Sequence, residues 1–287
     1  MARPIQDAIM LMGDSITSRQ DVPLSINALF SETYRRTLDV LNRGLGAYNT
    51  RFYLPLLDEF LLRRNEIQSI NSSTIQSQKI KLVTIWFGAN DSVLKGFLQH
   101  VPLEEYIENL NSILNKLTGS DSEYDSYEIS DGNSSGPLNI VLITPPPILP
   151  SMMGGFDFSG QRELENTRKY AKAVLDIGKE WKGREIKMKT SHWKIRTIDL
   201  FNGILNDAGG QADELKPYFT DGLHLSTKGY DIMWKQMINI LENDFKDRGI
   251  SPSELQESEF TIPDWNTLDH SNPNSAVEKM KGPYKRT

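Results

Sequence analysis

The chain of 287 residues contains no cysteine. Disulfide bonds, thiolate nucleophiles and zinc–thiolate sites are therefore excluded, and nothing in the sequence indicates an oxidising compartment. No run approaches the roughly 18 consecutive apolar residues of a membrane-spanning helix. The short apolar run at residues 8–12 is not followed by the cleavage site of a signal peptide. We therefore expect a cytoplasmic protein with no membrane span.

The chain also lacks an excess of basic residues, since its formal net charge is -6. It has no positive field to attract phosphates, so we expect neither nucleic acid nor an anionic membrane surface as a partner. The glycine-rich fingerprints of dinucleotide and P-loop sites are absent as well. No dinucleotide or P-loop cofactor is therefore indicated, and we expect no metal. The hydrophobic content of 38% is enough for a sizeable core.

Short apolar runs alternate with segments of helical periodicity along most of the chain. Strands are expected at residues 8–12, 81–87, 139–144 and 194–200. Helices are expected at residues 26–38, 51–62, 102–117, 162–181 and 227–245. Such alternation is typical of right-handed βαβ units, in which helices cover both faces of a parallel sheet.

Residues 1–249 are predicted to form one domain. Within it, residues 118–137 are acidic and rich in Ser, Gly and Asp, which is typical of a flexible inserted loop. Residues 250–287 form a C-terminal tail that is either disordered or laid over the surface by Phe260, Ile262 and Trp265. These apolar side chains also suggest a homodimer contact.

A candidate nucleophile follows directly on the first apolar run, in the sequence Gly13-Asp14-Ser15. Ligands bind parallel sheets at the carboxyl edge of the strands, and a serine on a tight turn there would present its hydroxyl and its own N–H to a cleft. The same residue types are common in turns without function. The motif therefore needs support from elsewhere in the chain.

A candidate base and its orienting carboxylate stand just before the last predicted helix, in the sequence Asp221-Gly222-Leu223-His224. A serine nucleophile needs a base to accept its proton, and the base needs a carboxylate that fixes its tautomer. An Asp three residues before a His can place both side chains in one turn. The alternative is an Asp that caps the helix, although Ser226 is better placed for that role.

Two further motifs lie where the predicted strands end. Asn90 follows the strand at residues 81–87, and a neutral amide there can donate to a developing oxyanion. The loop at residues 44–48 carries glycines, which let a backbone N–H approach a ligand closely. Taken alone, the Asn90 motif is better explained as an ordinary turn at the end of a strand, and the glycine loop is equally well explained as a turn between a strand and a helix.

Together, the four motifs resemble those of the SGNH (GDSL) hydrolases, and most closely those of the isoamyl acetate-hydrolysing esterases of that family. The resemblance covers roughly residues 6 to 245. It is carried by the stretches at residues 13–17, 42–44, 48–51, 87–91 and 220–226. It implies a three-layer α/β/α fold of flavodoxin-like type, with a five-stranded parallel sheet and no cofactor.

The resemblance also implies the roles of individual residues. Ser15 would be the nucleophile, His224 the base and Asp221 its orienter, while the oxyanion would be held by the Ser15 N–H, a backbone N–H of the glycine loop and the Asn90 side chain. The family usually has a glycine directly before the tyrosine of this loop. Here that position is Ala47, with Gly46 one residue earlier. Either residue could supply the N–H, and the alanine would be strained if the position requires a positive φ.

We therefore expect a serine esterase that hydrolyses short-acyl esters, such as isoamyl acetate, through an acyl-serine. A deacetylase, a thioesterase or a lysophospholipase could use the same triad, and a non-catalytic binding module could use the same scaffold. Five apolar residues are candidates for lining an alcohol pocket, although core packing is the favoured explanation for each of them. They are Met12, Phe52, Tyr53, Phe87 and Met152.

Overall fold

The fold is taken from a computed structural model of the chain. The structure describes residues 5–61, 78–118, 137–154, 160–190, 192–210, 213–255 and 260–281. The predicted insertion at residues 118–137 lies almost wholly outside the described residues. The limits of the predicted domain and tail remain predictions.

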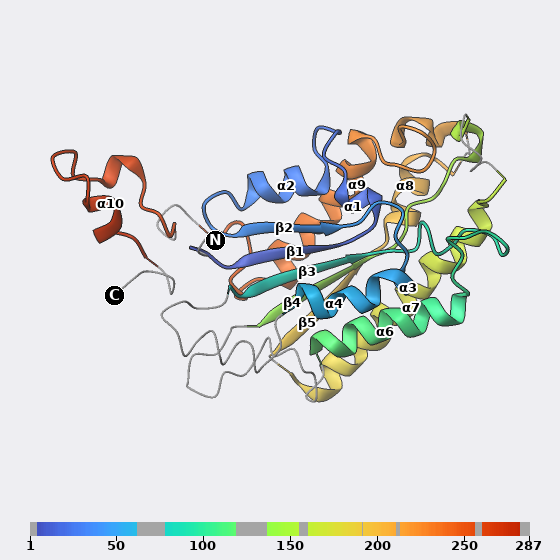
Figure 1. The fold of residues 1–287 in the computed structure, drawn as a ribbon, viewed down its shortest axis with the longest axis horizontal. Coiled ribbons are helices and arrows are strands. Elements are labelled where there is room, and N and C mark those ends of the chain that lie inside the picture. Colours follow the sequence, from blue (N-terminus) through green and yellow to red (C-terminus); the bar gives the residue numbers. More distant parts are fainter. Residues whose placement is uncertain are drawn as a thin grey trace.

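A five-stranded parallel sheet forms the centre of the molecule, with the strand order β2-β1-β3-β4-β5 (Figure 1). The strands are β1 (Ala8–Gly13), β2 (Asp39–Gly44), β3 (Ile80–Trp86), β4 (Leu138–Ile143) and β5 (Trp193–Ile198). Strands β1 and β4 are buried along their whole length, as continuous apolar runs predict for strands covered on both faces. The predicted parallel sheet is confirmed.

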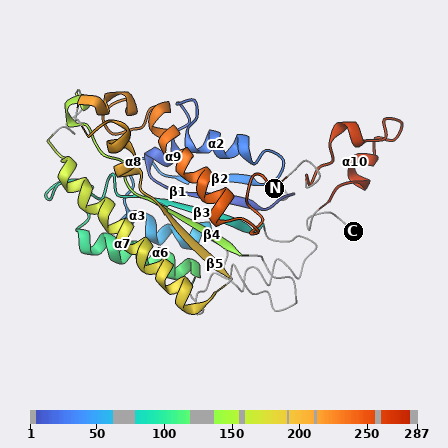
Figure 2. The ribbon, with the colours of Figure 1, turned by 180° about the vertical axis from the view of Figure 1, so that it is seen from behind.

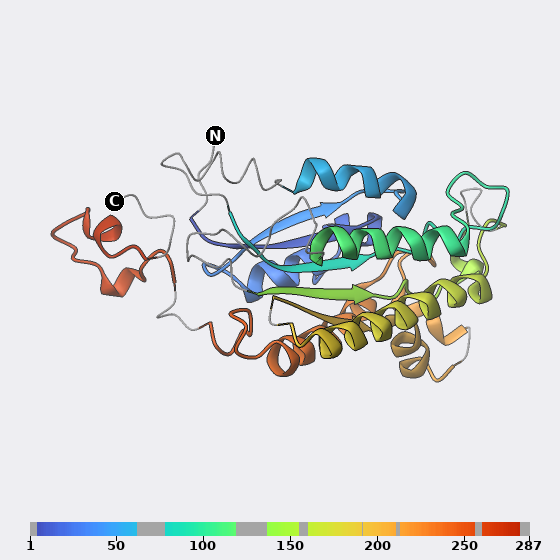
Figure 3. The ribbon, with the colours of Figure 1, turned by 90° about the horizontal axis from the view of Figure 1, so that it is seen from below.

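Helices cover both faces of the sheet and complete the predicted three-layer α/β/α fold (Figures 1 and 3). Because side chains alternate along a strand, Ile9 and Leu11 of β1 join one core, and Met10 and Met12 join the other. The first core is covered by α1 (Ser15–Ser18), α2 (Ile26–Thr33), α8 (Leu200–Asp207) and α9 (Thr227–Asn239). The second is covered by α3 (Thr50–Tyr53), α4 (Leu57–Phe60), α6 (Leu103–Thr118) and α7 (Leu164–Met188).

Several helices depart from the sequence prediction. The expected helix at residues 51–62 is broken into α3, a 3₁₀ turn (Leu54–Leu56) and α4, and Pro55 in the middle has no N–H to continue an α-helix. Helix α2 ends early because Arg36 adopts a left-handed conformation, with φ of 67°. The last predicted helix continues from α9 as a π-helix (Ile240–Asp244). Strand β2 and helix α8 were not among the elements that the apolar pattern predicted.

The described C-terminal segment 260–281 lies beside the end of the sheet at which the strands begin (Figures 1 and 2). It contains a 3₁₀ turn (Trp265–Thr267) and α10 (Ser275–Glu278). Arg36 contacts this segment through an ion pair of 2.9 Å with Asp264 and a cation–π contact of 4.4 Å with the Phe260 ring. Trp265 remains 71% exposed. The candidate catalytic motifs lie at the opposite edge of the sheet, where the strands end.

None of the described helices combines the length and the apolar character needed to cross a bilayer.

Candidate active site

The end of β1 presents Ser15 as the first residue of the short helix α1. Asp14 caps this helix and accepts a hydrogen bond of 2.8 Å from the Ile16 N–H. Gly13 is required for the close turn, because a Cβ there would lie 2.1 Å from Thr17 Oγ1. The Ser15 N–H donates to no other described residue. Both the hydroxyl and the N–H of Ser15 are therefore free to face a ligand.

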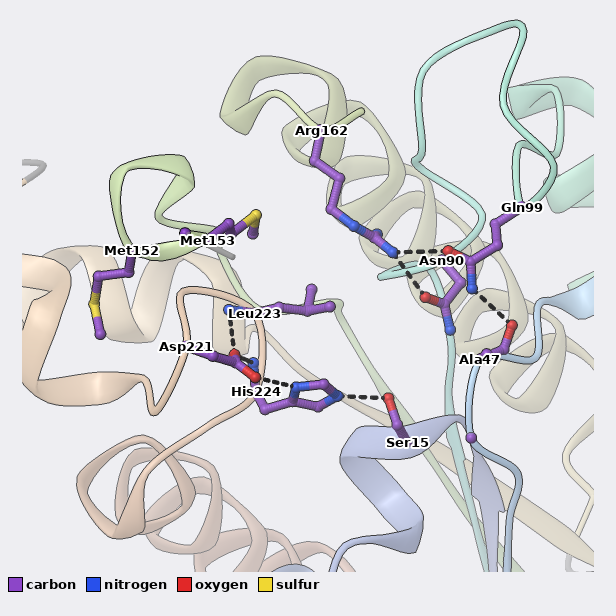
Figure 4. Close-up of a pocket in the computed structure, with 12 residues that line it drawn as sticks. Ser15, Ala47, Asn90, Gln99, Met152, Met153, Arg162, Asp221, Leu223 and His224 are labelled. Atoms are coloured by element: carbon purple, nitrogen blue, oxygen red, sulfur yellow. Dashed lines mark hydrogen bonds and ion pairs between the residues drawn. The ribbon is translucent and has the colours of Figure 1, made fainter. Parts of the chain in front are cut away.

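The predicted base and its carboxylate meet Ser15 as the sequence suggested (Figure 4). His224 Nε2 lies 2.9 Å from Ser15 Oγ, and His224 Nδ1 lies 2.6 Å from Asp221 Oδ2. Because Asp221 is an acceptor when ionised, Nδ1 carries the ring hydrogen and Nε2 accepts from the serine hydroxyl. The three residues thus form a continuous chain of hydrogen bonds from the carboxylate to the serine hydroxyl.

The loop before α9 holds Asp221 ionised and oriented. Burial alone would raise the pKa of Asp221, but hydrogen bonds from the His224 ring and from the N–H groups of His224 and Leu223 outweigh it, so the pKa lies well below its usual range. Gly222 adopts a φ of +86°, and a Cβ there would lie 2.3 Å from the Leu149 carbonyl oxygen. Only glycine lets this loop pack against the segment after β4.

Asn90 follows β3 and is buried, with 3% of its surface exposed. Its Nδ2 donates to the Tyr48 carbonyl at 2.8 Å, and its Oδ1 accepts from the Arg162 guanidinium at 3.0 Å. These two contacts fix which end of the amide is the donor. The second N–H of Nδ2 remains available, because an amide nitrogen has two hydrogens.

The glycine loop after β2 places an alanine in a conformation that favours glycine. Ala47 has a φ of 67°, whereas Gly46 has a negative φ and open space around its Cα. The residue at position 47 is therefore strained. Neither Gly46 nor Ala47 donates its N–H to another described residue. Both predicted loop donors are thus unclaimed.

Two buried carboxyl groups lie behind these motifs. Burial raises the pKa of Asp14 to about 7, and the nearby Asp91 adds to the rise. Burial also raises the pKa of Asp91 to about 6, although hydrogen bonds from the Thr50 hydroxyl and N–H, at 2.6 and 2.9 Å, oppose it. Asp91 also accepts from the Gly88 N–H at 3.1 Å. It therefore ties the start of α3 to the turn that carries Asn90.

The predicted site residues all line one cavity of about 460 Å³ (Figure 4). Its lining is Ser15, Gly46, Ala47, Asn90, Gln99, Met152, Met153, Gly154, Arg162, Asp221, Leu223 and His224. Of the five candidates for an alcohol pocket, only Met152 lies there. Met12, Tyr53 and Phe87 are buried in the core, and Phe52 is 60% exposed. Core packing, which was favoured over a pocket role for each residue, is thus the position found for Met12, Tyr53 and Phe87.

Two lining residues, Gln99 and Arg162, were not singled out from the sequence. Neither residue follows directly on a predicted strand, so the pattern that singled out Ser15 and Asn90 does not mark them. Within the part of the chain that the structure describes, no group of three or more acidic or histidine side chains is arranged to hold a metal ion.

A model of the GDSL-like lipase/acylhydrolase family matches residues 11–232 of the chain. A GDSL esterase/lipase of Arabidopsis thaliana is 29% identical over 283 residues, which cover 94% of this chain and 97% of the relative. The isoamyl acetate-hydrolyzing esterase 1 homolog of Bos taurus is 28% identical over 271 residues, which cover 92% and 89% of the two chains.

Solved structures share the fold. A lipase/acylhydrolase from Enterococcus faecalis superimposes with a TM-score of 0.51 at 20% identity, covering 80% of this chain and 93% of that chain. An acetylxylan esterase from Geobacillus stearothermophilus gives 0.50 at 16% identity, with coverages of 81% and 93%. The family match spans most of the chain and every motif at the cavity. This chain belongs to the GDSL-like lipase/acylhydrolase family and is a carboxylic ester hydrolase.

Proposed function

We propose that the protein is a serine esterase that hydrolyses short-acyl carboxylic esters through an acyl-serine. Ser15 Oγ attacks the ester carbonyl while His224 takes its proton, and His224 then returns this proton to the departing alcohol. Water attacks the acyl-serine with His224 again as base, which releases the acid and restores Ser15. Asp221 orients the imidazole and stabilises its charged form.

The observation that carries the proposal is the contact of 2.9 Å between Ser15 Oγ and His224 Nε2 at the wall of the cavity. This distance suits proton transfer in general base catalysis. The ionised Asp221 at 2.6 Å from His224 Nδ1 supplies the third group that such a pair requires.

The oxyanion of the tetrahedral intermediate is assigned to three donors: the Ser15 N–H, a loop N–H at Ala47 or Gly46, and the Asn90 amide. Each of these groups lines the cavity and has a hydrogen that no described residue accepts. Donors held in place before the reaction stabilise the developing charge at no cost of reorganisation.

The size and lining of the cavity favour a small, partly apolar ester. A volume of about 460 Å³ lies at the low end of the roughly 300–1,000 Å³ of small-molecule sites. Met152, Met153 and Leu223 supply apolar surface on the side of the cavity that carries Asp221 (Figure 4). The name of the Bos taurus relative, an isoamyl acetate-hydrolyzing esterase homolog, points to an acetate ester of a small alcohol.

The test is a series of p-nitrophenyl esters of increasing acyl length, with isoamyl acetate as a natural-type substrate. The proposal expects the highest kcat/KM for acetate or butyrate and loss of hydrolysis in Ser15→Ala. Ser18→Ala, in the same short helix, serves as the control that keeps activity. A preference for long-chain lysophospholipids, for thioesters or for acetylated sugars would replace the proposed substrate class. An inactive wild-type protein that still binds esters would support a binding module instead.

A further inference from the structure

Arg162 is a buried cation in the wall of the active-site cavity. Its side chain is 3% exposed, and burial lowers its pKa to about 10. Its Nε is also buried and has no hydrogen-bond partner within the described part of the chain. A buried charge and an unpaired donor both cost stability, and such a cost in a native protein calls for an explanation other than packing.

The contacts of the Arg162 guanidinium are all neutral oxygens at the site. One nitrogen donates to the Ala89 carbonyl, and the other lies 3.0 Å from Asn90 Oδ1 and 3.0 Å from Gln99 Oε1. None of the described carboxylates contacts it directly, although the buried carboxyl groups of Asp14 and Asp91 act on it through space and oppose the fall in its pKa. Its positive charge is therefore not neutralised by direct contact.

Two chains of hydrogen bonds lead from Arg162 to the proposed oxyanion donors. In the first, the guanidinium holds Asn90 Oδ1, and Asn90 Nδ2 donates to the Tyr48 carbonyl at 2.8 Å. In the second, Gln99 accepts from Arg162 and donates through Nε2 to the Ala47 carbonyl at 2.9 Å. One side chain thus restrains both the amide donor and the loop donor (Figure 4).

We propose that Arg162 is a positioning residue for the oxyanion hole, a role that rests on the function proposed above for Asn90. The guanidinium fixes the Asn90 amide with its nitrogen toward the reacting carbonyl. Its charge at the oxygen end of that amide polarises the group, so that the N–H at the other end becomes a stronger donor. This gain appears only when the substrate oxygen becomes negative, and it therefore lowers the barrier without tightening ester binding.

The proposal predicts how Arg162→Met changes kcat and KM. Methionine keeps the apolar part of the arginine side chain and removes both its charge and its unpaired Nε. The kcat for p-nitrophenyl acetate should fall about 10- to 100-fold, less than or equal to the roughly 10²–10³-fold loss expected for removing a whole donor. KM should stay within about threefold. Arg168→Met, on the exposed side of α7, is the matched control and should keep wild-type kinetics.

A double-mutant cycle with Asn90→Ala separates positioning from a general structural effect. If Arg162 acts through Asn90, then Arg162→Met should lower kcat less than threefold further in the Asn90→Ala background. If the losses multiply instead, then Arg162 does not work through Asn90 and the inference is wrong. If Asn90→Ala alone leaves kcat unchanged, the proposed role of Asn90 itself fails. The two failures are therefore distinguishable.

Chemical rescue covers the case in which Arg162→Met does not fold. In Arg162→Ala, millimolar methylguanidinium should restore kcat at least fivefold, whereas methylammonium should not, because only the planar ion can bridge the separate oxygen acceptors. Gln99→Ala breaks only the second chain of hydrogen bonds and should give a smaller loss of kcat. Equal rescue by both ions, or a wild-type kcat in soluble Arg162→Ala, would overturn the inference.

Discussion

Replacement of Ala47 by glycine tests whether the backbone of the loop donor is strained, a question that arises from the φ seen in the structure. Ala47 has a φ of 67°, and its carbonyl is held by Gln99 at 2.9 Å. A left-handed conformation costs an L-residue roughly 1–2 kcal/mol. Glycine removes this cost, while its greater freedom in the unfolded chain takes back about 0.4–1 kcal/mol. We expect Ala47→Gly to stabilise the protein by about 1 kcal/mol.

Gly46→Ala provides the matched control one residue earlier. Gly46 has no positive φ, and nothing lies within 4 Å of a Cβ placed on it. The alanine should therefore be tolerated and should stabilise by roughly 0.4–1 kcal/mol through the unfolded chain.

Urea denaturation at pH 7 measures both effects, and hydrolysis of p-nitrophenyl acetate measures the consequence for catalysis. Ala47→Gly should keep kcat within about threefold, because the donor is a main-chain N–H. Destabilisation of Ala47→Gly by 1 kcal/mol or more would refute the strain argument. A loss of kcat of more than about tenfold would show that the methyl group, or the φ it restricts, belongs to the site.

Three other substitutions test the surroundings of the triad. Asp14→Asn keeps an acceptor for the Ile16 N–H and removes a carboxyl whose pKa burial raises to about 7 from 3.8. Because the folded state binds this proton more tightly than the unfolded state, the stability of the wild type should decrease as the pH rises from 4 to 7. The variant should therefore be more stable than the wild type at pH 8, by up to roughly 4 kcal/mol, and equally stable near pH 3. A difference in stability that does not change with pH in urea denaturation would contradict this. Gly222→Ala should lower both the melting temperature and kcat, because its Cβ would lie 2.3 Å from the Leu149 carbonyl. Gly209→Ala is the control: Gly209 also has a positive φ but lies in open space, so this variant should lose only about 1–2 kcal/mol of stability through backbone strain. Asp221→Asn should lower kcat by several orders of magnitude with little change in KM, since the wrong histidine tautomer is then favoured, and a loss below tenfold would argue against Asp221 as the orienting group.

The sequence was sufficient to predict the layers of the fold and to single out Ser15, Asp221 and His224, which the structure brings into contact. Ser15 and Asn90 follow continuous apolar strands, and parallel topology brings the ends of such strands to one edge. Asp221 and His224 are close in the chain, so a single turn decides their contact. These inferences depend on short-range patterns and a general rule of topology.

The remaining features depend on contacts that no local pattern specifies. Arg162 reaches the loops after β3 from a position 72 residues away in the chain, and nothing in its own neighbourhood distinguishes it from a surface arginine. The φ of Ala47 is likewise set by the packing of its loop and not by alanine itself. The helix expected at residues 51–62 begins at Thr50, so Pro55 lies beyond its first turn and interrupts it.

Covalent labelling of the intact protein with a fluorophosphonate, followed by peptide mapping, tests the central claim most directly. An activated serine Oγ attacks the phosphorus of this reagent and displaces fluoride, and Ser15 is the serine whose Oγ lies 2.9 Å from His224 Nε2. The account predicts a single labelled peptide that contains Ser15, loss of label in Ser15→Ala, and loss of esterase activity in proportion to labelling. Labelling of another serine that accounts for the activity, or full hydrolysis by a protein that carries no label, would contradict it.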